Sequence, residues 1–135
     1  MQGVVRRYEV DGGPVTTPVL KVATYLPIRR YRDLFAFLRM NARITQQLKE
    51  TPGLVRFQVR AQFFHRRFWT VSVWRDRPAM NTFVRTPPHR DAISKFAEWH
   101  DTGACFIDWE SPDPVIDWKE SADRLTQARP YGERP

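Results

Sequence analysis

Hydrophobic and polar residues alternate along residues 54–64 with the two-residue period of a half-buried strand. One face carries Val55, Phe57, Val59, Ala61 and Phe63, and the other carries Arg56, Gln58, Arg60 and Gln62. Similar patterns predict strands at 19–26, 68–74 and 104–110. The short segment 65–67 favours an antiparallel hairpin between the strands at 54–64 and 68–74.

Apolar residues recur at helical spacing between these strands. The longest helix is predicted at 31–50, before Thr51-Pro52-Gly53, with an apolar stripe of Leu34, Phe37, Leu38, Ile44 and Leu48. Asn41 interrupts the stripe near its centre, and Gln46 and Gln47 are expected to face away from it. Shorter helices are predicted at 77–85, capped by Asp76, and at 88–100, after Pro87. The order βαββαβ predicts an α+β, ferredoxin-like fold with an antiparallel sheet.

The chain divides into three parts by composition. Residues 1–17 contain Gly12-Gly13-Pro14 and are expected to form an N-terminal arm, before a ferredoxin-like domain at 18–110. Residues 111–135 form a C-terminal tail, in which Asp117-Trp-Lys-Glu120 matches a capping box that begins a short amphipathic helix. We expect this tail to dock on the domain or on a partner.

Strand parity sorts the sheet residues into two faces. The aliphatic face, expected beneath the helices, comprises Leu20, Val22, Val55, Phe57, Val59, Trp69, Val71, Val73, Cys105 and Ile107. The second face comprises Lys21, Tyr25, Arg56, Gln58, Arg60, Phe68, Thr70, Ser72, Trp74, Phe106 and Asp108. This mixed face is too aromatic to be left in water, so a second copy's sheet is its natural cover. The sequence therefore predicts a homodimer that buries Phe68, Trp74 and Phe106.

Composition narrows the class of protein. The 135 residues, 41% of them hydrophobic, suit one globular domain. The net charge of +7 is scattered in pairs of arginines without a long basic run, which favours a solvated surface over a nucleic-acid site. A lone cysteine, Cys105, excludes an intrachain disulfide and suits a reducing cytoplasm. No apolar run reaches a membrane span, and the first residues lack the order of a signal peptide.

The chain resembles the dimeric α+β barrel superfamily in its order of strands and helices and in several short segments. These segments are Pro52-Gly53-Leu54 at the start of the second strand, residues 68–76, Met80 with Phe83, and Pro88-His89. Within this superfamily, the chain is most similar to antibiotic-biosynthesis-monooxygenase-like proteins and to the spheroidene monooxygenase-like branch. The resemblance covers roughly residues 18–110. It implies a dimeric barrel, and its known activities range from cofactor-independent oxygenation to heme degradation and non-redox cyclisation.

The resemblance also implies site residues. His89 matches a histidine of the spheroidene monooxygenase-like branch, for which heme association has been inferred. The proximal histidine of heme-degrading members corresponds to Ile93, and their tryptophan in the preceding helix corresponds to Phe83. The cofactor expectation is therefore none or heme, with His89 as the metal ligand only if heme is bound.

His89 is also a candidate from its position alone. It shares a helical stripe with Ala92, Ile93 and Phe96, so its ring is expected to point inward. An inward histidine is a core group bonded to a backbone carbonyl, an acid or base, or a ligand of a metal or heme. The dipole at a helix start favours the neutral imidazole that a base or ligand needs.

Asn41 is the second catalytic candidate, because a buried amide requires a hydrogen-bonding partner. That partner is a strand side chain such as Thr24, a water, or a substrate carbonyl or oxyanion. The candidate substrate-binding residues are Tyr25, Trp69, Trp74, Phe83 and Arg60, either as walls for a flat ligand or as a clamp for a carboxylate. The same residues are alternatively core aromatics and a surface ion-pair partner.

No phosphate loop, nucleophile elbow or metal-binding cluster is found in the sequence. The sequence therefore predicts a cytoplasmic monooxygenase-like tailoring enzyme with a hydrophobic small-molecule substrate. Two alternatives remain: a non-oxidative cyclase or isomerase with His89 as acid and base, and a non-catalytic dimeric module that binds a ligand.

Overall fold

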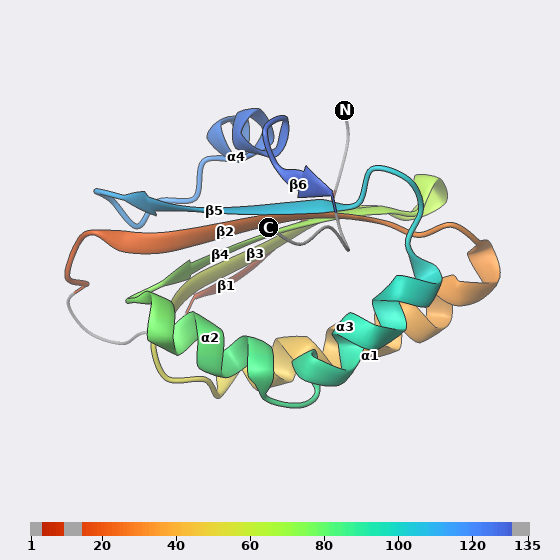
Figure 1. Ribbon diagram of the computed structural model, residues 1–135, viewed down its shortest axis with the longest axis horizontal. Coiled ribbons are helices and arrows are strands. Elements are labelled where there is room, and N and C mark those ends of the chain that lie inside the picture. The colour runs from red at the N-terminus through yellow and green to blue at the C-terminus, as the bar shows by residue number, and fades with distance from the viewer. Residues whose placement is uncertain (1–3, 10–14, 131–135) are drawn as a thin grey trace.

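Six strands form one antiparallel sheet in the order β1-β3-β4-β2-β5-β6. A computed structural model describes residues 4–9, by backbone alone, and 15–130 (Figure 1). The strands are β1 (Val4–Glu9), β2 (Val19–Pro27), β3 (Leu54–Gln62), β4 (Arg67–Trp74), β5 (Cys105–Ser111) and β6 (Arg129–Pro130). The four predicted strands are present, and β1 and β6 extend the sheet at its edges. Gly12-Gly13-Pro14 of the predicted N-terminal arm lies outside the described residues.

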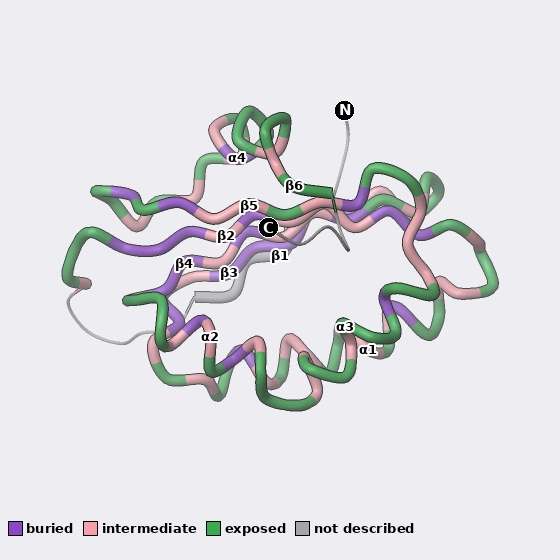
Figure 2. Tube along the Cα trace, viewed as in Figure 1, coloured by how far each residue is buried: buried purple, intermediate pink, exposed green. Residues whose placement is uncertain are grey.

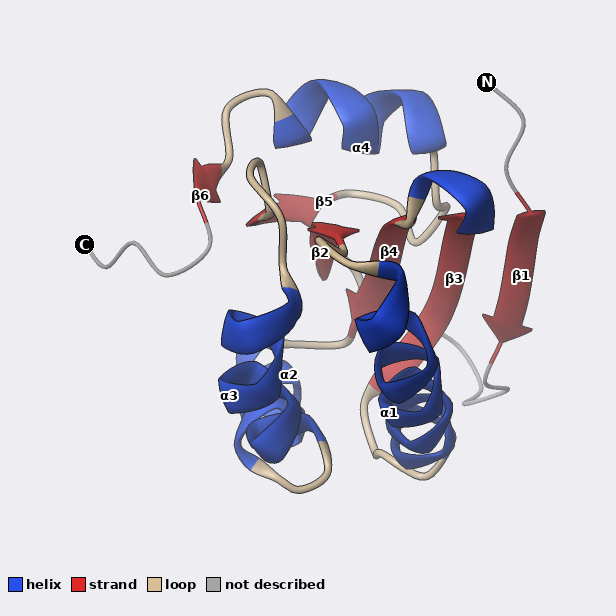
Figure 3. Ribbon diagram, turned by 90° about the vertical axis from the view of Figure 1, so that its right-hand side faces the viewer, coloured by secondary structure: helices blue, strands red, loops and turns tan. Residues whose placement is uncertain are grey.

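The helices cover both faces of the sheet (Figures 1 and 3). They are α1 (Tyr31–Lys49), α2 (Arg77–Arg85), α3 (His89–Trp99) and α4 (Trp118–Leu125), with a short 3-10 helix, η1 (Phe63–His65), between β3 and β4. Helices α1, α2 and α3 lie together on one face, and α4 lies alone on the other. This arrangement confirms the predicted α+β, ferredoxin-like fold. No helix in the described part of the chain is long and apolar enough to cross a membrane.

Local chemistry fixes the helix boundaries near the site. The Asp76 carboxylate accepts a hydrogen bond from the Ala79 backbone N–H at 2.9 Å, which caps α2 as the sequence predicts. Gly53 has a φ of 92°, and a Cβ at this residue would lie 2.5 Å from the Cβ of Ala79. The turn from α1 into β3 therefore requires glycine both for its backbone conformation and for the close approach of α2.

The predicted faces of β4 and β5 are wrong, and the pairing register gives the reason. Trp74 pairs with Leu20, and Thr70 pairs with Thr24, so these β4 residues share the helix-covered face with β2. Val71 packs with Ala23 and Trp109 on the opposite face, next to α4. Both faces of β4 are apolar, so alternation alone does not determine which face the helices cover.

A β-bulge reverses the predicted side of one further residue. The pairing of β3 with β4 shifts between Leu54 and Arg56. Leu54 joins the core beneath α1 and α2, whereas Val55 packs with Val19 and Val73 on the α4 face. A bulge places two residues opposite one, so strict alternation fails at this point.

The C-terminal tail covers the sheet face that the sequence assigned to a second copy. Trp118 of α4 donates its indole N–H to Gln58 Oε1 at 2.8 Å, and the Arg60 guanidinium lies 4.9 Å from the centre of the Trp118 ring. Phe68 and Trp74, expected at the dimer interface, lie beneath the helices of their own chain and are only 2% and 1% exposed. Figure 2 shows that buried residues, in purple, follow one another along the central strands of the sheet. The tail thus docks on its own domain, which is one of the two alternatives that the sequence left open.

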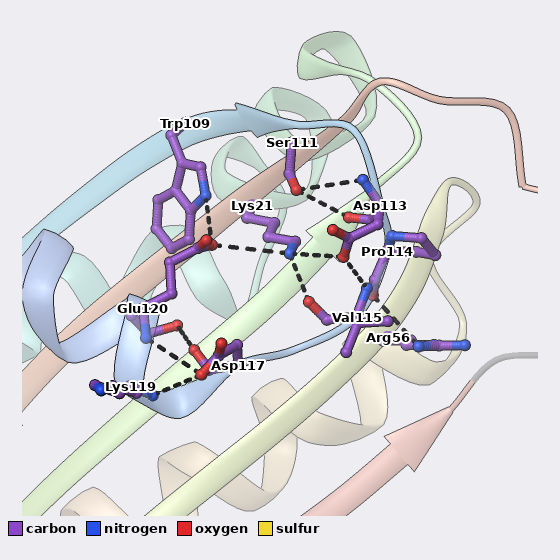
Figure 4. A network of polar contacts seen from close by, with 11 residues as sticks. Lys21, Arg56, Trp109, Ser111, Asp113, Pro114, Val115, Asp117, Lys119 and Glu120 are labelled. Carbon is purple, nitrogen blue, oxygen red and sulfur yellow. Dashed lines mark hydrogen bonds and ion pairs between the residues drawn. The ribbon is translucent and has the colours of Figure 1, made fainter.

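Lys21 of β2 holds the tail against the sheet (Figure 4). Its side chain is 3% exposed, and its ammonium lies 3.4 Å from Asp113 Oδ1 and 3.9 Å from Glu120 Oε1. It also donates to the carbonyl of Val115, and the Trp109 indole N–H donates to Glu120 Oε1 at 3.1 Å. The acidic partners are much more exposed than the lysine, so the two sides of this contact differ in solvation.

Because of this difference in solvation, removing the lysine and removing its carboxylate partners should lower the free energy of unfolding by different amounts. Lys21→Met should lower the free energy of unfolding by about 1–2 kcal/mol, because the two carboxylates can still be hydrated. The double variant Asp113→Asn with Glu120→Gln should cost more, since it leaves a buried ammonium without a counter-charge. Urea unfolding of the three proteins measures both values, and equal costs would contradict the asymmetry.

Candidate functional site

A cavity of about 140 Å³ lies between the sheet and helices α1, α2 and α3. Its wall is mostly aliphatic and aromatic, with Leu26, Phe37, Ile44 and Phe96 among the lining residues. The polar side chains that line it are Thr24, Thr70, Ser72, Asn41 and His89. Among the residues that the structure describes, no Asp, Glu, Lys or Arg lines this cavity. The wall therefore favours an uncharged, hydrophobic ligand.

The polar floor of the cavity comes from β2 and β4. The hydroxyls of Thr24 and Thr70 are directly paired across the two strands and hydrogen-bond to each other. The Trp74 indole N–H donates to Ser72 Oγ at 2.9 Å. Each of these groups already has a partner, so the floor can meet a ligand without leaving a buried donor unpaired.

His89 is the first residue of α3, and its ring borders the cavity. Its Nδ1 lies 3.2 Å from the carbonyl oxygen of Val84, and its ring centre lies 4.6 Å from that of Phe83. A carbonyl only accepts, so Nδ1 carries the proton and Nε2 has a free lone pair in the neutral ring. Burial lowers the pKa of His89 below the usual histidine value, and the bond to Val84 offsets part of that shift.

Gln47 of α1 holds the segment that carries His89. Its amide nitrogen donates to the carbonyls of Phe83 at 3.2 Å and Thr86 at 3.0 Å, and its Oε1 accepts from the backbone N–H of His89 at 3.0 Å. One side chain thus ties the end of α2 to the start of α3. The sequence prediction that Gln47 faces away from the apolar stripe missed this contact, because glutamine at the edge of a stripe is usually solvated.

Removing this amide should disturb the imidazole more than the fold. Gln47→Leu keeps the volume but leaves three backbone groups without their partner, with an expected stability loss of about 1–3 kcal/mol. Gln47→Glu keeps the acceptor for His89 N–H but loses both donors. We expect the His89 ring resonances to shift in the NMR spectra of both variants, and Gln46→Leu, one residue away, to leave them unchanged. Unshifted resonances in Gln47→Leu would contradict the positioning role.

One comparison decides the family. Residues 22–95, which run from within β2 to within α3, match the family model described as antibiotic biosynthesis monooxygenase. The chain belongs to the antibiotic biosynthesis monooxygenase family. The match covers more than half of the chain and contains all the cavity residues named above except Phe96.

Solved structures share the fold of this family member at low sequence identity. SnoaB, a cofactor-independent oxygenase from Streptomyces nogalater, superposes with a TM-score of 0.59 and 13% identity over 75% of this chain and 100% of that chain. LmHde, a heme-degrading enzyme from Listeria monocytogenes, superposes with a TM-score of 0.62 and 18% identity over 82% of this chain and 71% of that chain. A conserved protein from Methanosarcina mazei Go1 superposes with a TM-score of 0.60 and 10% identity over 68% of this chain and 91% of that chain. No curated protein sequence matches the chain.

The structure brings together four of the seven predicted site residues of this antibiotic biosynthesis monooxygenase family member. His89, Asn41, Trp74 and Phe83 all line the cavity. Tyr25 and Trp69 lie on the other face of the sheet, where their rings stack with centres 5.4 Å apart. Arg60 also lies on that face, against Trp118. The three residues are thus separated from His89 by the sheet.

Asn41 lies where α1 borders two hollows. It lines the cavity and also a groove on the other side of α1 that contains Leu38, Val59 and Phe63. No hydrogen bond of its side-chain amide is found among the described residues, whereas its backbone carbonyl accepts from Thr45. Thr24, the partner considered from the sequence, bonds to Thr70 instead. The amide therefore remains available to a ligand or to water.

The residues present do not fit heme in this family member's cavity. A volume of about 140 Å³ is similar to the roughly 150 Å³ of an apolar cavity that binds benzene. Cofactor-sized ligands usually occupy about 300–1,000 Å³. Heme also carries two propionates, and no described lining residue is cationic. Apart from heme, no cluster of three His, Cys, Asp or Glu residues that could hold a bare metal ion occurs within the described ranges.

Proposed function

We propose that this protein is a cofactor-independent monooxygenase that oxidises a small, electron-rich phenol in the cavity between the sheet and the helices. The observation that carries the proposal is His89: a buried imidazole, held by Val84 in the tautomer with a free Nε2, in an otherwise uncharged cavity. A base of lowered pKa stays neutral at pH 7 and can remove a phenolic proton.

The proposed reaction needs no external reductant. Nε2 of His89 takes the phenol proton, and the phenolate supplies electrons to O₂ as a new C–O bond forms at the para carbon. His89 returns the proton to the outer peroxide oxygen, and the resulting hydroperoxide loses water when the O–O bond and the C–H bond at that carbon break. One oxygen atom becomes the second quinone oxygen and the other leaves as water, so phenol and O₂ give quinone and water in equal amounts.

Two neutral features of the cavity support this reaction. Its apolar wall excludes water from the intermediates and admits O₂, which is itself apolar. The Asn41 amide can donate a hydrogen bond to the phenolate oxygen, whose charge develops as the proton leaves. Asn41→Leu should therefore lower turnover at retained stability, whereas an amide that meets only water should tolerate leucine.

The test uses 1-naphthol as the probe. Freshly purified protein should be colourless, consume one O₂ per naphthol and form 1,4-naphthoquinone that carries one ¹⁸O atom from labelled O₂. A Soret band in the purified protein, or turnover that requires added hemin, would contradict the cofactor-independent reaction. Products formed equally fast without oxygen would indicate the cyclase or isomerase alternative. Saturable naphthol binding without any product would indicate a ligand-binding module.

We also propose a homodimer, but through another surface than the sheet face that the sequence predicts. The tail covers one sheet face and α1–α3 cover the other, so a second copy would meet a different surface from the one predicted. Phe106, 37% exposed on β5, is the one residue of the predicted contact that remains accessible. Sedimentation at micromolar concentration measures the assembly, and Phe106→Ser tests whether this residue belongs to the contact.

A further inference from the structure

Exposed aromatic rings gather at the end of the molecule where α1 begins and the β3–β4 hairpin turns. Phe35 is 80% exposed, Phe64 87% and Tyr31 59%, which is unusual for side chains of this size. Tyr31 and Phe35 are one helical turn apart on α1, and the Tyr31 hydroxyl donates to the Phe64 carbonyl at 2.6 Å. We call Tyr31, Phe35, Phe63 and Phe64 the aromatic end.

The aromatic end is surrounded by positive charge. Residues 28–39 and 63–67 contain six arginines and one aspartate, and that aspartate, Asp33, is bound by Arg30 at 2.9 Å. Arg29, Arg32, Arg39 and Arg67 are exposed, and no ion pair of theirs is found among the described residues. Most of the net charge of +7 therefore lies around the exposed rings.

The two segments are held rigidly against each other. Arg66 donates from Nε to the Ile28 carbonyl at 3.0 Å, and its guanidinium lies 4.1 Å from the centre of the Tyr31 ring. The Ile28 N–H in turn donates to the Arg66 carbonyl at 2.8 Å. A preformed surface of this kind loses little conformational entropy when it binds.

We propose that the aromatic end docks on an anionic lipid membrane. Exposed Phe and Tyr rings enter the boundary between head groups and acyl chains, while arginines around them pair with lipid phosphates. A second copy of the chain is a poor occupant, because the arginines of two such ends would face each other. A nucleic acid favours a groove that follows its backbone, whereas these rings protrude, as their high exposure shows.

Packed rings connect this end with the cavity. Phe63 contacts Phe68 with ring centres 5.7 Å apart, and Phe68 contacts Phe37, a cavity residue, at 4.7 Å. Docking here would place the cavity next to a membrane from which a hydrophobic ligand could be taken. The docking proposal itself is independent of any reaction, so its test measures binding alone.

The test is co-sedimentation of the full chain with vesicles. Vesicles of phosphatidylcholine with about 30% phosphatidylglycerol should carry the protein down, neutral phosphatidylcholine vesicles should not, and about 0.5 M salt should release it. Phe35→Ser with Phe64→Ser, and separately Arg32→Glu with Arg67→Glu, should each lower the bound fraction about fivefold or more. All four residues are exposed, so these variants should keep the fold, which circular dichroism checks.

A matched control separates this end from net charge. Lys119→Glu with Arg124→Glu makes the same change of charge on α4, where both residues are exposed, and it should keep binding within about twofold. Equal loss in the control and in Arg32→Glu with Arg67→Glu would overturn the proposal in favour of unspecific attraction. So would vesicle binding that the phenylalanine variants leave unchanged. A dimer that dissociates in those variants, or single-stranded DNA bound in preference to vesicles, would assign the surface to a second copy or a nucleic acid.

Discussion

Replacing His89 with alanine is expected to lower turnover of 1-naphthol by about 100-fold or more, the usual effect of losing a general base. The cavity contains no other titratable side chain among the described residues, so no neighbour can replace the imidazole. The His89 residue as a whole is only partly buried, and its ring bonds to one carbonyl, so the fold should survive. Steady-state oxygen uptake, with circular dichroism as the folding control, measures both quantities.

Two further observations distinguish a base from a structural histidine. His89→Gln can keep a bond to Val84 but cannot take a proton, so it should be as inactive as alanine. The activity of the natural protein should fall on the acid side with an apparent pKa below about 6.5, because burial lowers the pKa of His89. If both variants keep full turnover and only melt earlier, His89 is structural and the proposed reaction is wrong.

The same shift predicts how stability depends on pH. The folded state holds the neutral ring, so below the unfolded pKa of about 6.5 the unfolded chain binds a proton that the folded chain does not. The contribution of His89 to stability should therefore be complete above this pH and decline as the pH falls toward the lowered folded pKa. Comparison with His89→Gln isolates this contribution from that of the carboxylates.

Replacing Trp74 with alanine is expected to lower the free energy of unfolding by about 3–5 kcal/mol. Trp74 is 1% exposed, packs against Phe83 with ring centres 5.3 Å apart, and belongs to the core with Leu20, Leu48 and Met80. Its removal also leaves Ser72 Oγ without its donor. Because the ring borders the cavity, alanine would enlarge the cavity as well as remove buried apolar surface.

Trp69→Ala is the matched control, since the same residue type lies five positions earlier in β4 on the opposite face. Trp69 is only partly buried and stacks on Tyr25, so its loss should cost about half as much. Urea unfolding with a common slope compares the two variants directly. A larger cost for Trp69 would contradict the assignment of Trp74 to the main core.

Element type could be predicted from the sequence because the signals are local. The glycine turn at Gly53, the Asp76 cap and the alternation in β3 each depend on neighbouring residues. The side of the sheet that a residue faces is not local: it depends on the register with β2, and one bulge at Val55 reverses it. Thus Trp74 was correctly expected to be buried, but against a partner sheet instead of its own helices.

The candidate site divides along the same line. His89 and Asn41 were predicted from their positions in helical stripes, and both line the cavity. Tyr25, Trp69 and Arg60 were candidates by residue type, and the sheet separates them from it. Gln47 had no signal in the sequence because its three backbone partners lie 36 to 42 residues away. The pattern to look for is a long polar side chain at the edge of an apolar helical stripe, close to a linker between helices whose backbone N–H and C=O groups need hydrogen-bond partners.

The residues that line the cavity lie between Val22 and Trp99, whereas α4 and its contacts through Asp113 and Glu120 follow Ser111. The cavity and the cover of the second sheet face therefore belong to separate stretches of sequence on opposite sides of one sheet. Substitutions in the tail can accumulate without altering the ligand wall, and a different tail could be joined after β5. Such a protein could acquire new partners while the wall of its cavity stays the same.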